Sequence, residues 1–539
     1  MTDDVRPGGT YKTLAEQREV LTPAEERFER IRQTAGLFLG PIVFLIMFFL
    51  PLPLEPNQQT LAAVLSFTIV YWLSEAIPIP VTAVIALALC VVLNVPDVGP
   101  DAEDAPGDIV FGSFADPTIF LFIGAFIIAQ AMITHGLDRR FAFRILSLPG
   151  VAKSTYGVII AFGAISALIS AFISNTATAA MLLPIGLGMM GALGGLVSEQ
   201  SDTNRDVSRL RFGTALMLMI SYGAGVGGLL TPIGSPPNLI GISFIEAETD
   251  ATITFFSWVV AAAPICLLMF VALCVILLLL NRPEVRRISG AEEYVNEERA
   301  KLGSLSRGER NTLIAFGAAV TLWVLPGVIA LIFGDESAIY SVILSRLDEG
   351  TVAIFAAGLL FLLPVDWSER RFTMNWNEAV RIDWGTIILF GSGIALGTLL
   401  SETGLAGVIG TGIAETFGFT SLLAVSAVSA IIAILISETT SNTASATIVV
   451  PIVIPIANAA GLDPVIPGPR RRIRRVLRVH DARLHAAERR CLRLGHDPHN
   501  QDGPLRHLLR RHRPDPDSAP HPDHGPPRRL RVIQTRRGV

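Results

Sequence analysis

Residues 170–178 read Ser-Ala-Phe-Ile-Ser-Asn-Thr-Ala-Thr, and residues 437–445 read Ser-Glu-Thr-Thr-Ser-Asn-Thr-Ala-Ser. Each polar stretch interrupts an otherwise apolar segment, and the two Ser-Asn-Thr triplets lie 267 positions apart. Pro184 and Pro451 share this spacing, within the similar sequences TAAMLLPI and SATIVVPI. A triplet repeated by chance would not bring its flanking residues with it, so the pattern indicates an internal duplication.

A second pair of segments supports the duplication. The run TIFLFIGAFIIAQAMITHGLD, which begins at Thr118, aligns with TIILFGSGIALGTLLSETGLA, which begins at Thr386, at a spacing of 268. We therefore predict a first repeat at 36–281 and a second at 311–467, joined by a loop at 282–310.

The composition places these repeats in a lipid bilayer. The chain of 539 residues is 51% hydrophobic and 17% charged, whereas a soluble domain is usually charged at about a quarter of its positions. Its apolar residues form long runs, most of them near the ~20 residues that a spanning helix needs. The clearest runs are Gly36–Leu54, Ile253–Leu280, Thr312–Gly334, Gly385–Ser401 and Thr439–Leu462. We predict an all-α, polytopic membrane protein.

The basic residues predict its orientation. Lys and Arg concentrate on cytoplasmic loops of membrane proteins, and here they gather at 30–32, 139–153, 205–211 and 282–310. Spanning helices near 36–54, 59–77, 79–95 and 117–135 return the chain to the side where it began. Residues 1–35 are polar and unlike a signal peptide. We therefore expect residues 1–35 and the loop at 282–310 in the cytoplasm, and a multi-pass protein of a bacterial inner membrane.

The polar stretches are expected at the tips of re-entrant hairpins. The apolar segment between Lys153 and Arg205 has basic flanks at both ends, so it should enter and leave on the cytoplasmic side, with its tip at 174–176. Three spanning helices are expected near 312–333, 350–364 and 385–402. They bring the chain to the outer side, so the second hairpin, with its tip at 441–443, should enter from outside. The two repeats are then inverted. Polar backbone at membrane depth lines a cavity or is buried in protein; the alternative is a helix packed through small residues.

A broken helix is predicted at 227–238, Gly-Gly-Leu-Leu-Thr-Pro-Ile-Gly-Ser-Pro-Pro-Asn. Three prolines lack the backbone N–H, and the glycines loosen the chain. An unwound stretch inside a membrane offers free carbonyl groups to an ion. The alternative is a simple proline kink.

The chemistry of these breaks suits an anion together with a small cation. The N-terminus of a half-helix presents unpaired N–H groups to an anion, while hydroxyl, amide and carbonyl oxygens can surround sodium. Ser170 and Ser174 are one helical turn apart, so we expect their hydroxyls on one face. The second tip repeats this spacing with Ser437, Ser441 and Asn442.

The paired Ser-Asn-Thr tips and the Gly-Ser-Pro-Pro-Asn break resemble the divalent anion:sodium symporter family over residues 36–467. The resemblance implies these sodium ligands: Ser170, Ser174, Asn175, Gly234, Ser437, Ser441 and Asn442. It implies these substrate contacts: Asn175, Thr176, Ser235, Asn442 and Thr443. It also implies a homodimer, an elevator-type motion, and no cofactor beyond sodium as the coupling ion.

The resulting prediction is a secondary transporter that couples sodium influx to uptake of a small divalent anion, most readily a C4-dicarboxylate. The rival of the same fold is a dicarboxylate exchanger independent of sodium. A membrane-embedded enzyme is disfavoured because the sequence has no metal-ligand cluster and His135 is its one histidine before 468. The sequence leaves open whether the anion is succinate, malate, fumarate, citrate or sulfate.

The composition changes at Gly468. From there to Val539 the chain contains 19 Arg and 8 of its 9 His, without Lys or an aromatic residue. The range 468–539 can be interpreted as a disordered basic tail that contacts RNA or anionic lipid. We instead predict that it is translated out of frame, since a GC-rich gene read one base off gives this composition, and we expect no nucleic-acid partner.

The genetic code permits this interpretation. Codons for Val479–Cys491 can be chosen so that reading one base later gives Phe-Met-Thr-Pro-Val-Ser-Thr-Pro-Pro-Asn-Ala-Val. This would be the counterpart, in the second repeat, of Gly-Ser-Pro-Pro-Asn. The chain as it stands is then expected to be a truncated, inactive product.

Overall fold

The computed structural model describes residues 23–99, 102–200, 211–248, 252–284, 290–334, 336–417, 422–439 and 442–459. The described chain is helical apart from one short antiparallel ribbon, β1 (Pro364–Asp366) paired with β2 (Arg371–Phe372). The predicted all-α class is confirmed. The predictions for residues 1–22, for Ser441 and for the basic range 468–539 lie outside the described residues.

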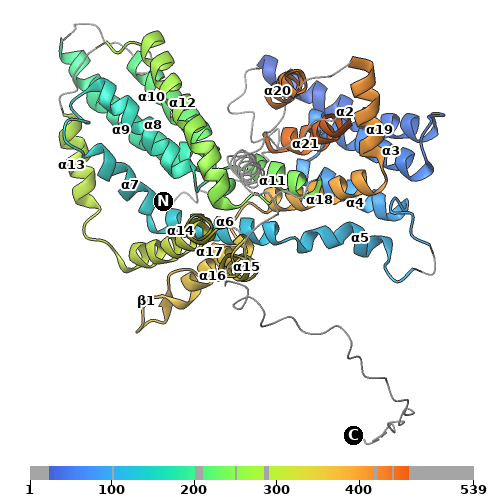
Figure 1. Ribbon diagram of the computed structural model, residues 1–539. Helices are drawn as coiled ribbons and strands as arrows, with labels where there is room; N and C mark the ends of the chain where they lie inside the picture. The colour runs from blue at the N-terminus through green and yellow to red at the C-terminus, as the bar shows by residue number, and fades with distance from the viewer. Residues whose placement is uncertain are drawn as a thin grey trace, which may run out of the picture. The chain divides into compact units, whose positions relative to one another are not determined.

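The helices before the first hairpin lie where the apolar runs predict them (Figure 1). A proline at the first position starts several of them, which suits a helix end because its N–H would have no partner there. Asp116 accepts a hydrogen bond from the Thr118 N–H at 2.7 Å and so caps the last of these helices. The elements are α2 (Pro23–Phe49), α3 (Pro56–Ser74), α4 (Ile79–Val92), α5 (Pro106–Gly112), η1 (Ser113–Ala115) and α6 (Pro117–His135).

The first hairpin and the broken helix follow. Their elements are α7 (Leu137–Leu146), α8 (Thr155–Ser170), α9 (Asn175–Gln200), α10 (Arg211–Gly228), η3 (Pro232–Gly234), α11 (Pro236–Glu248) and α12 (Phe255–Leu280). Two predicted boundaries were wrong. The turn at the tip occupies 171–174 and not 174–176, because α9 already begins at Asn175. The break is shorter than 227–238, because α10 continues to Gly228 and α11 resumes at Pro236.

The second part of the chain contains the elements of the second hairpin. Its elements are α13 (Ala291–Lys301), α14 (Arg307–Phe333), α15 (Ala338–Arg346), α16 (Glu349–Leu362), α17 (Trp376–Ala379), α18 (Trp384–Glu402), α19 (Leu405–Phe417), α20 (Leu422–Thr439) and α21 (Asn442–Ala459). Within the described ranges, five helices are long and apolar enough to cross a membrane: α2, α6, α12, α14 and α18. Shorter apolar helices include α4, α8 and α16. This pattern is that of a multi-pass membrane protein.

Two local geometries recur at the spacing of the sequence duplication. Gly136 joins α6 to α7 with φ of 68°, and Gly404, 268 positions later, joins α18 to α19 with φ of 74°. This left-handed conformation suits glycine, which has no Cβ to clash. Phe122 of α6 and its counterpart Phe390 of α18 are both buried and contact each other edge to face, with ring centroids 4.9 Å apart.

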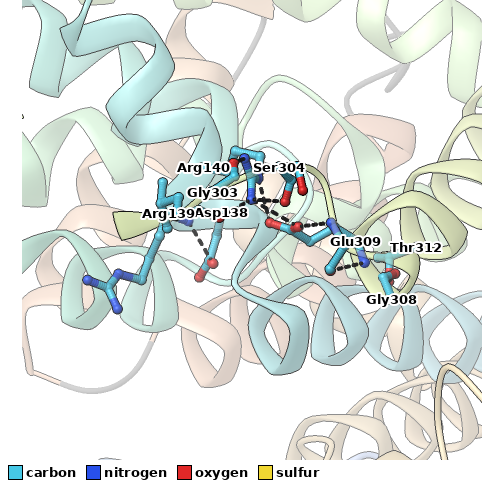
Figure 2. A network of polar contacts seen from close by, with 10 residues as sticks. Asp138, Arg139, Arg140, Gly303, Ser304, Gly308, Glu309 and Thr312 are labelled. Atoms are coloured by element: carbon cyan, nitrogen blue, oxygen red, sulfur yellow. Dashed lines mark hydrogen bonds and ion pairs between the residues drawn. The ribbon is translucent and has the colours of Figure 1, made fainter. Parts of the chain in front are cut away.

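An arginine clamp holds the segment between α13 and α14 against α7 (Figure 2). The Arg140 guanidinium donates to both carboxylate oxygens of Glu309, at 2.5 and 3.0 Å, and to the carbonyl oxygens of Leu302 and Gly303, at 2.8 and 3.0 Å. The side chain of Glu309 is only 5% exposed. Beside it, burial raises the pKa of the Asp138 carboxyl to about 6. The clamp fixes the start of α14 relative to the helix that leads into the first hairpin.

Candidate functional site

The tip of the first hairpin is organised by two serines with different roles. The Ser170 hydroxyl donates to Asn175 Oδ1 at 2.6 Å, so it orients the amide across the turn. The Ser174 hydroxyl instead accepts from the Ala177 N–H at 3.3 Å, as the cap of α9. The expectation that Ser170 and Ser174 share one helical face was wrong, because the helix ends at Ser170 and a new one begins after Ser174.

The broken helix is tied to this tip. The Thr231 hydroxyl donates a short hydrogen bond to the Ala171 carbonyl oxygen and accepts from the Gly234 N–H at 3.1 Å. The Asn238 amide donates to the carbonyl oxygens of Gly228, at 2.7 Å, and Thr231, at 2.9 Å. Thr231 and Asn238 are both buried, and they therefore hold the two ends of the break in place.

Carbonyl oxygens converge on Gly234. A Cβ atom built there would lie 2.8 Å from the Gly228 oxygen, 2.9 Å from the Ala171 oxygen and 3.0 Å from the Ser170 oxygen. Three carbonyl oxygens around one buried glycine form a set of donors that suits a hard cation, and unwound backbone supplies such donors in transporters. The residues present thus fit sodium.

The Asn175 amide lies against Gly228, whose carbonyl oxygen is one of the three near Gly234. A Cβ atom at Gly228 would lie 2.5 Å from Asn175 Oδ1, so glycine is needed for the amide to approach α10. α9 begins at Asn175 itself, and α11 begins at Pro236, two residues after Gly234. A helix N-terminus carries about half a positive charge, so two of them favour an anion beside the carbonyl oxygens. Thr176, in the first turn of α9, is exposed, and Ser235, just before α11, is half-buried.

The second tip repeats part of this geometry. The Ser437 hydroxyl donates to Asn442 Oδ1 at 2.6 Å, as Ser170 does to Asn175. Thr443, which follows Asn442 in α21, accepts through its carbonyl oxygen from the Thr447 hydroxyl at 2.9 Å. Asn442 is exposed and Ser437 half-buried. In the part of the chain that the structure describes, the convergence of carbonyl oxygens is seen at the first tip.

One cavity of about 250 Å³ lies elsewhere, between α11 and α18. Phe244 and Gly397 line it, and a Cβ atom at Gly397 would collide with the Phe244 ring. None of the predicted sodium or substrate residues lines this cavity. The tip and the break, rather than this cavity, are therefore the candidate site.

Sequence reasoning missed Gly228, Thr231 and Asn238. All three lie in the stretch that predicted the broken helix, and polar Thr and Asn inside an apolar segment were a usable signal. The roles of Gly228 and Thr231 depend on contacts with Asn175 and Ala171, more than 50 positions earlier, which periodicity does not reveal.

Comparison with known proteins identifies the family. A sequence model described as the sodium:sulfate symporter transmembrane region matches residues 32–467. The chain belongs to this family. The resemblance to divalent anion:sodium symporters is thereby confirmed, and the chain is a transporter and not an enzyme.

Curated relatives in this family are similar over most of their length. The sodium-dependent dicarboxylate transporter SdcS of Staphylococcus saprophyticus is 30% identical over 446 residues, which cover 82% of each chain. The protein of the same name from Staphylococcus aureus strain USA300 is 30% identical over 438 residues, which cover 80% of each.

Proposed function

We propose that this family member couples sodium influx to uptake of a small divalent anion, with a C4-dicarboxylate as its substrate. The observation that carries the proposal is the convergence of the Ser170, Ala171 and Gly228 carbonyl oxygens on Gly234, beside the Asn175 amide and two helix N-termini. A cation bound there would neutralise part of the charge of an anion at the helix ends, so each ligand would favour the other. The relatives are named sodium-dependent dicarboxylate transporters, which supports both sodium and a dicarboxylate as ligands.

The roles of individual residues follow the chemistry of the tips. We infer that Ser170, Ser174, Asn175 and Gly234 form a first sodium site, and that Asn175, Thr176 and Ser235 contact the anion. In the second repeat we infer that Ser437, Ser441 and Asn442 bind sodium. Asn442 and Thr443 would then contact the second carboxylate.

The working protein is proposed to be a homodimer in a bacterial plasma membrane, with its N-terminus in the cytoplasm. An elevator-type movement of the hairpins would carry the site across the bilayer. Inverted hairpins place their tips near the midplane, where one site can be exposed to either side in turn.

Uptake in proteoliposomes tests the coupling. Labelled succinate should accumulate under an inward sodium gradient and should not accumulate in potassium. The protein assayed is one whose reading frame after codon 467 is corrected, as the composition of residues 468–539 predicts. A panel of malate, fumarate, citrate and sulfate as competitors ranks the substrates. Equal uptake in sodium and potassium, with exchange of internal for external dicarboxylate, would replace symport with the exchanger.

A further inference from the structure

Exposed tryptophans gather where two apolar helices end. Three of the chain's six tryptophans lie between positions 367 and 384. Trp367 is 72% exposed, Trp376 is 67% exposed, and Trp384 is exposed as well. The ribbon of β1 and β2 projects from the end of α16 (Figure 1), and Trp384 is the first residue of α18. Both helices are apolar, so these tryptophans lie at the level where the chain leaves the hydrocarbon.

The indole N–H groups separate these tryptophans from those in the protein interior. Trp72 and Trp323 are each 2% exposed, and each donates its N–H to a backbone carbonyl oxygen, at 3.2 and 3.0 Å. Within the described part of the chain, the N–H groups of Trp367 and Trp376 have no acceptor. Exposed tryptophans with a free N–H are typical of the membrane–water boundary, where the ring contacts lipid and the N–H meets headgroups or water.

The turn of the ribbon holds Trp367 at its tip. Asp366 Oδ1 accepts from the Ser368 N–H at 2.9 Å and from the Ser368 hydroxyl at 2.5 Å. The Arg370 N–H then donates to the Trp367 carbonyl oxygen at 3.3 Å and closes the turn. Beyond β2, the Thr373 hydroxyl donates to the last residue of the α16 end, at 2.8 Å. The ribbon is therefore fixed to α16, and its exposed side chains are presented at a defined place.

Arginine side chains surround this turn. Arg370 and Arg371 are exposed, and among the described residues neither guanidinium has an ion pair or an acceptor. Arg307, the first residue of α14, lies beside them, since its guanidinium donates to the Val365 carbonyl oxygen of β1 at 3.4 Å. Three guanidinium groups thus meet at the ribbon, and two of them are free to bind a ligand.

The carboxylates of the ribbon do not cancel this charge. Asp366 is occupied by Ser368, and Glu369 is the other carboxylate of the turn. The arginines outnumber these two groups, so the turn is positive. A guanidinium can pair with a phosphate through two parallel hydrogen bonds. Tryptophan rings beside free guanidiniums at a helix end therefore suit an anionic phospholipid, whose acyl chains meet the rings and whose headgroup meets the arginines.

We propose that the turn of this ribbon is a binding site for an anionic phospholipid. The site, called here the ribbon surface, consists of Trp367, Arg370, Arg371 and Trp376. A lipid bound there would anchor the adjoining ends of α16 and α18 in one leaflet. The inference depends neither on which anion is carried nor on the reading frame after codon 467.

Tryptophan quenching tests the ribbon surface in the whole chain. The protein in neutral detergent is titrated with phosphatidylglycerol brominated on its acyl chains, or with the matching phosphatidylcholine. The emission of Trp367 and Trp376 is the difference between the parent and Trp367→Phe/Trp376→Phe. Residues 468–539 contain no aromatic residue, so lipid held by that basic range adds nothing to the signal. Half-quenching should need at least about 10-fold less phosphatidylglycerol than phosphatidylcholine.

Arginine variants give the charge dependence. Each basic residue near an anionic lipid surface is worth about fivefold in binding, so Arg370→Gln/Arg371→Gln should raise the phosphatidylglycerol needed for half-quenching about 10- to 30-fold. Arg370→Lys/Arg371→Lys should keep most of the affinity. Arg346→Gln, at the exposed last residue of α15, is the control and should change nothing. Without lipid, all of these variants should melt as the parent does, because the side chains are exposed.

Several results would overturn the proposal. Equal quenching by the two lipids would show that the ribbon surface does not select an anionic headgroup. Unchanged phosphatidylglycerol affinity in Arg370→Gln/Arg371→Gln would show that the arginines do not bind it. Complete displacement by a tenfold excess of inorganic phosphate would assign the arginines to free phosphate. Displacement by polyglutamate but not by unbrominated phosphatidylglycerol would assign the ribbon surface to an acidic protein.

Discussion

Replacing Gly234 by alanine should weaken the first sodium site and also force the backbone of the break to shift. The added Cβ would lie within 3.0 Å of three carbonyl oxygens, those of Gly228, Ala171 and Ser170. It would therefore occupy the space where a cation meets them. Losing one charged contact of this kind costs about 1.5–3 kcal/mol, which corresponds to a sodium constant raised roughly 10- to 150-fold.

The assay uses the stabilisation of the folded state by its ligand. A bound ion raises stability with the logarithm of its concentration over its dissociation constant, so melting curves in detergent are recorded against sodium at constant ionic strength, with potassium as the counter-titrant. Gly234→Ala should need about 10- to 150-fold more sodium for the same shift.

Gly225→Ala is the matched control. Gly225 lies in α10, near Gly228, and a Cβ atom there would meet nothing within 4 Å. Alanine in a helix is favoured over glycine by about 0.5–1 kcal/mol, so this variant should keep the sodium response and melt no lower than the parent. Identical sodium responses of the Gly234 and Gly225 variants would refute the placement of the site.

Three further predictions concern single side chains. Thr176→Ala should mainly raise the apparent substrate constant and Ser174→Ala the sodium constant in uptake assays of the frame-corrected protein; Ser174→Ala should also lower the melting temperature, since the cap of α9 is worth about 0.5–2 kcal/mol. Wild-type constants in both would show that the tip is not the site. Arg140→Ala leaves the buried Glu309 carboxylate without its cation, which should cost about 3–5 kcal/mol and lower the melting temperature strongly. Arg139→Ala, at a 54% exposed side chain, should change it little, and equal effects would contradict the clamp. Asp138→Asn should raise the melting temperature clearly at about pH 8 and only slightly at about pH 4. Burial raises the pKa of this carboxyl from 3.8 to about 6, so between these two values the folded state binds more protons than the unfolded state. Stability therefore falls as the pH rises from about 4 to about 6 and stays low above that. A pH-independent effect of the asparagine variant would refute this.

Much of the fold could be predicted from the sequence because the bilayer imposes simple rules. Spanning segments must be long and apolar, and their helices lie close to the predicted ranges. The duplication was visible as a repeated spacing, and the equivalent residues Phe122 and Phe390 do meet. The predicted tip of the first hairpin, 174–176, lay a few residues after the observed turn at 171–174. The difference arises because Ser174 caps α9 and so decides where that helix begins.

The candidate site was predicted in part. The sequence marked both Ser-Asn-Thr tips, and each has the same hydroxyl-to-amide hydrogen bond. It assigned sodium mainly to side chains, whereas the structure brings together backbone carbonyl oxygens, which every residue has and no residue type reveals. Gly234 was singled out, but its partners Ala171 and Gly228 were not.

The sequence by itself determined that this protein spans a membrane and where its polar breaks lie, and it predicted an internal duplication, since these depend on local composition and spacing. Tertiary structure decided which groups meet at the break. A hydrogen bond from Thr231 fixes the unwound chain against a turn 60 residues earlier, Asn238 ties the two ends of the break to each other, and glycines at 228 and 234 leave the space that the contact needs. Such contacts require segments that are distant in the sequence to approach each other closely. The sequence does not state which distant segments will do so.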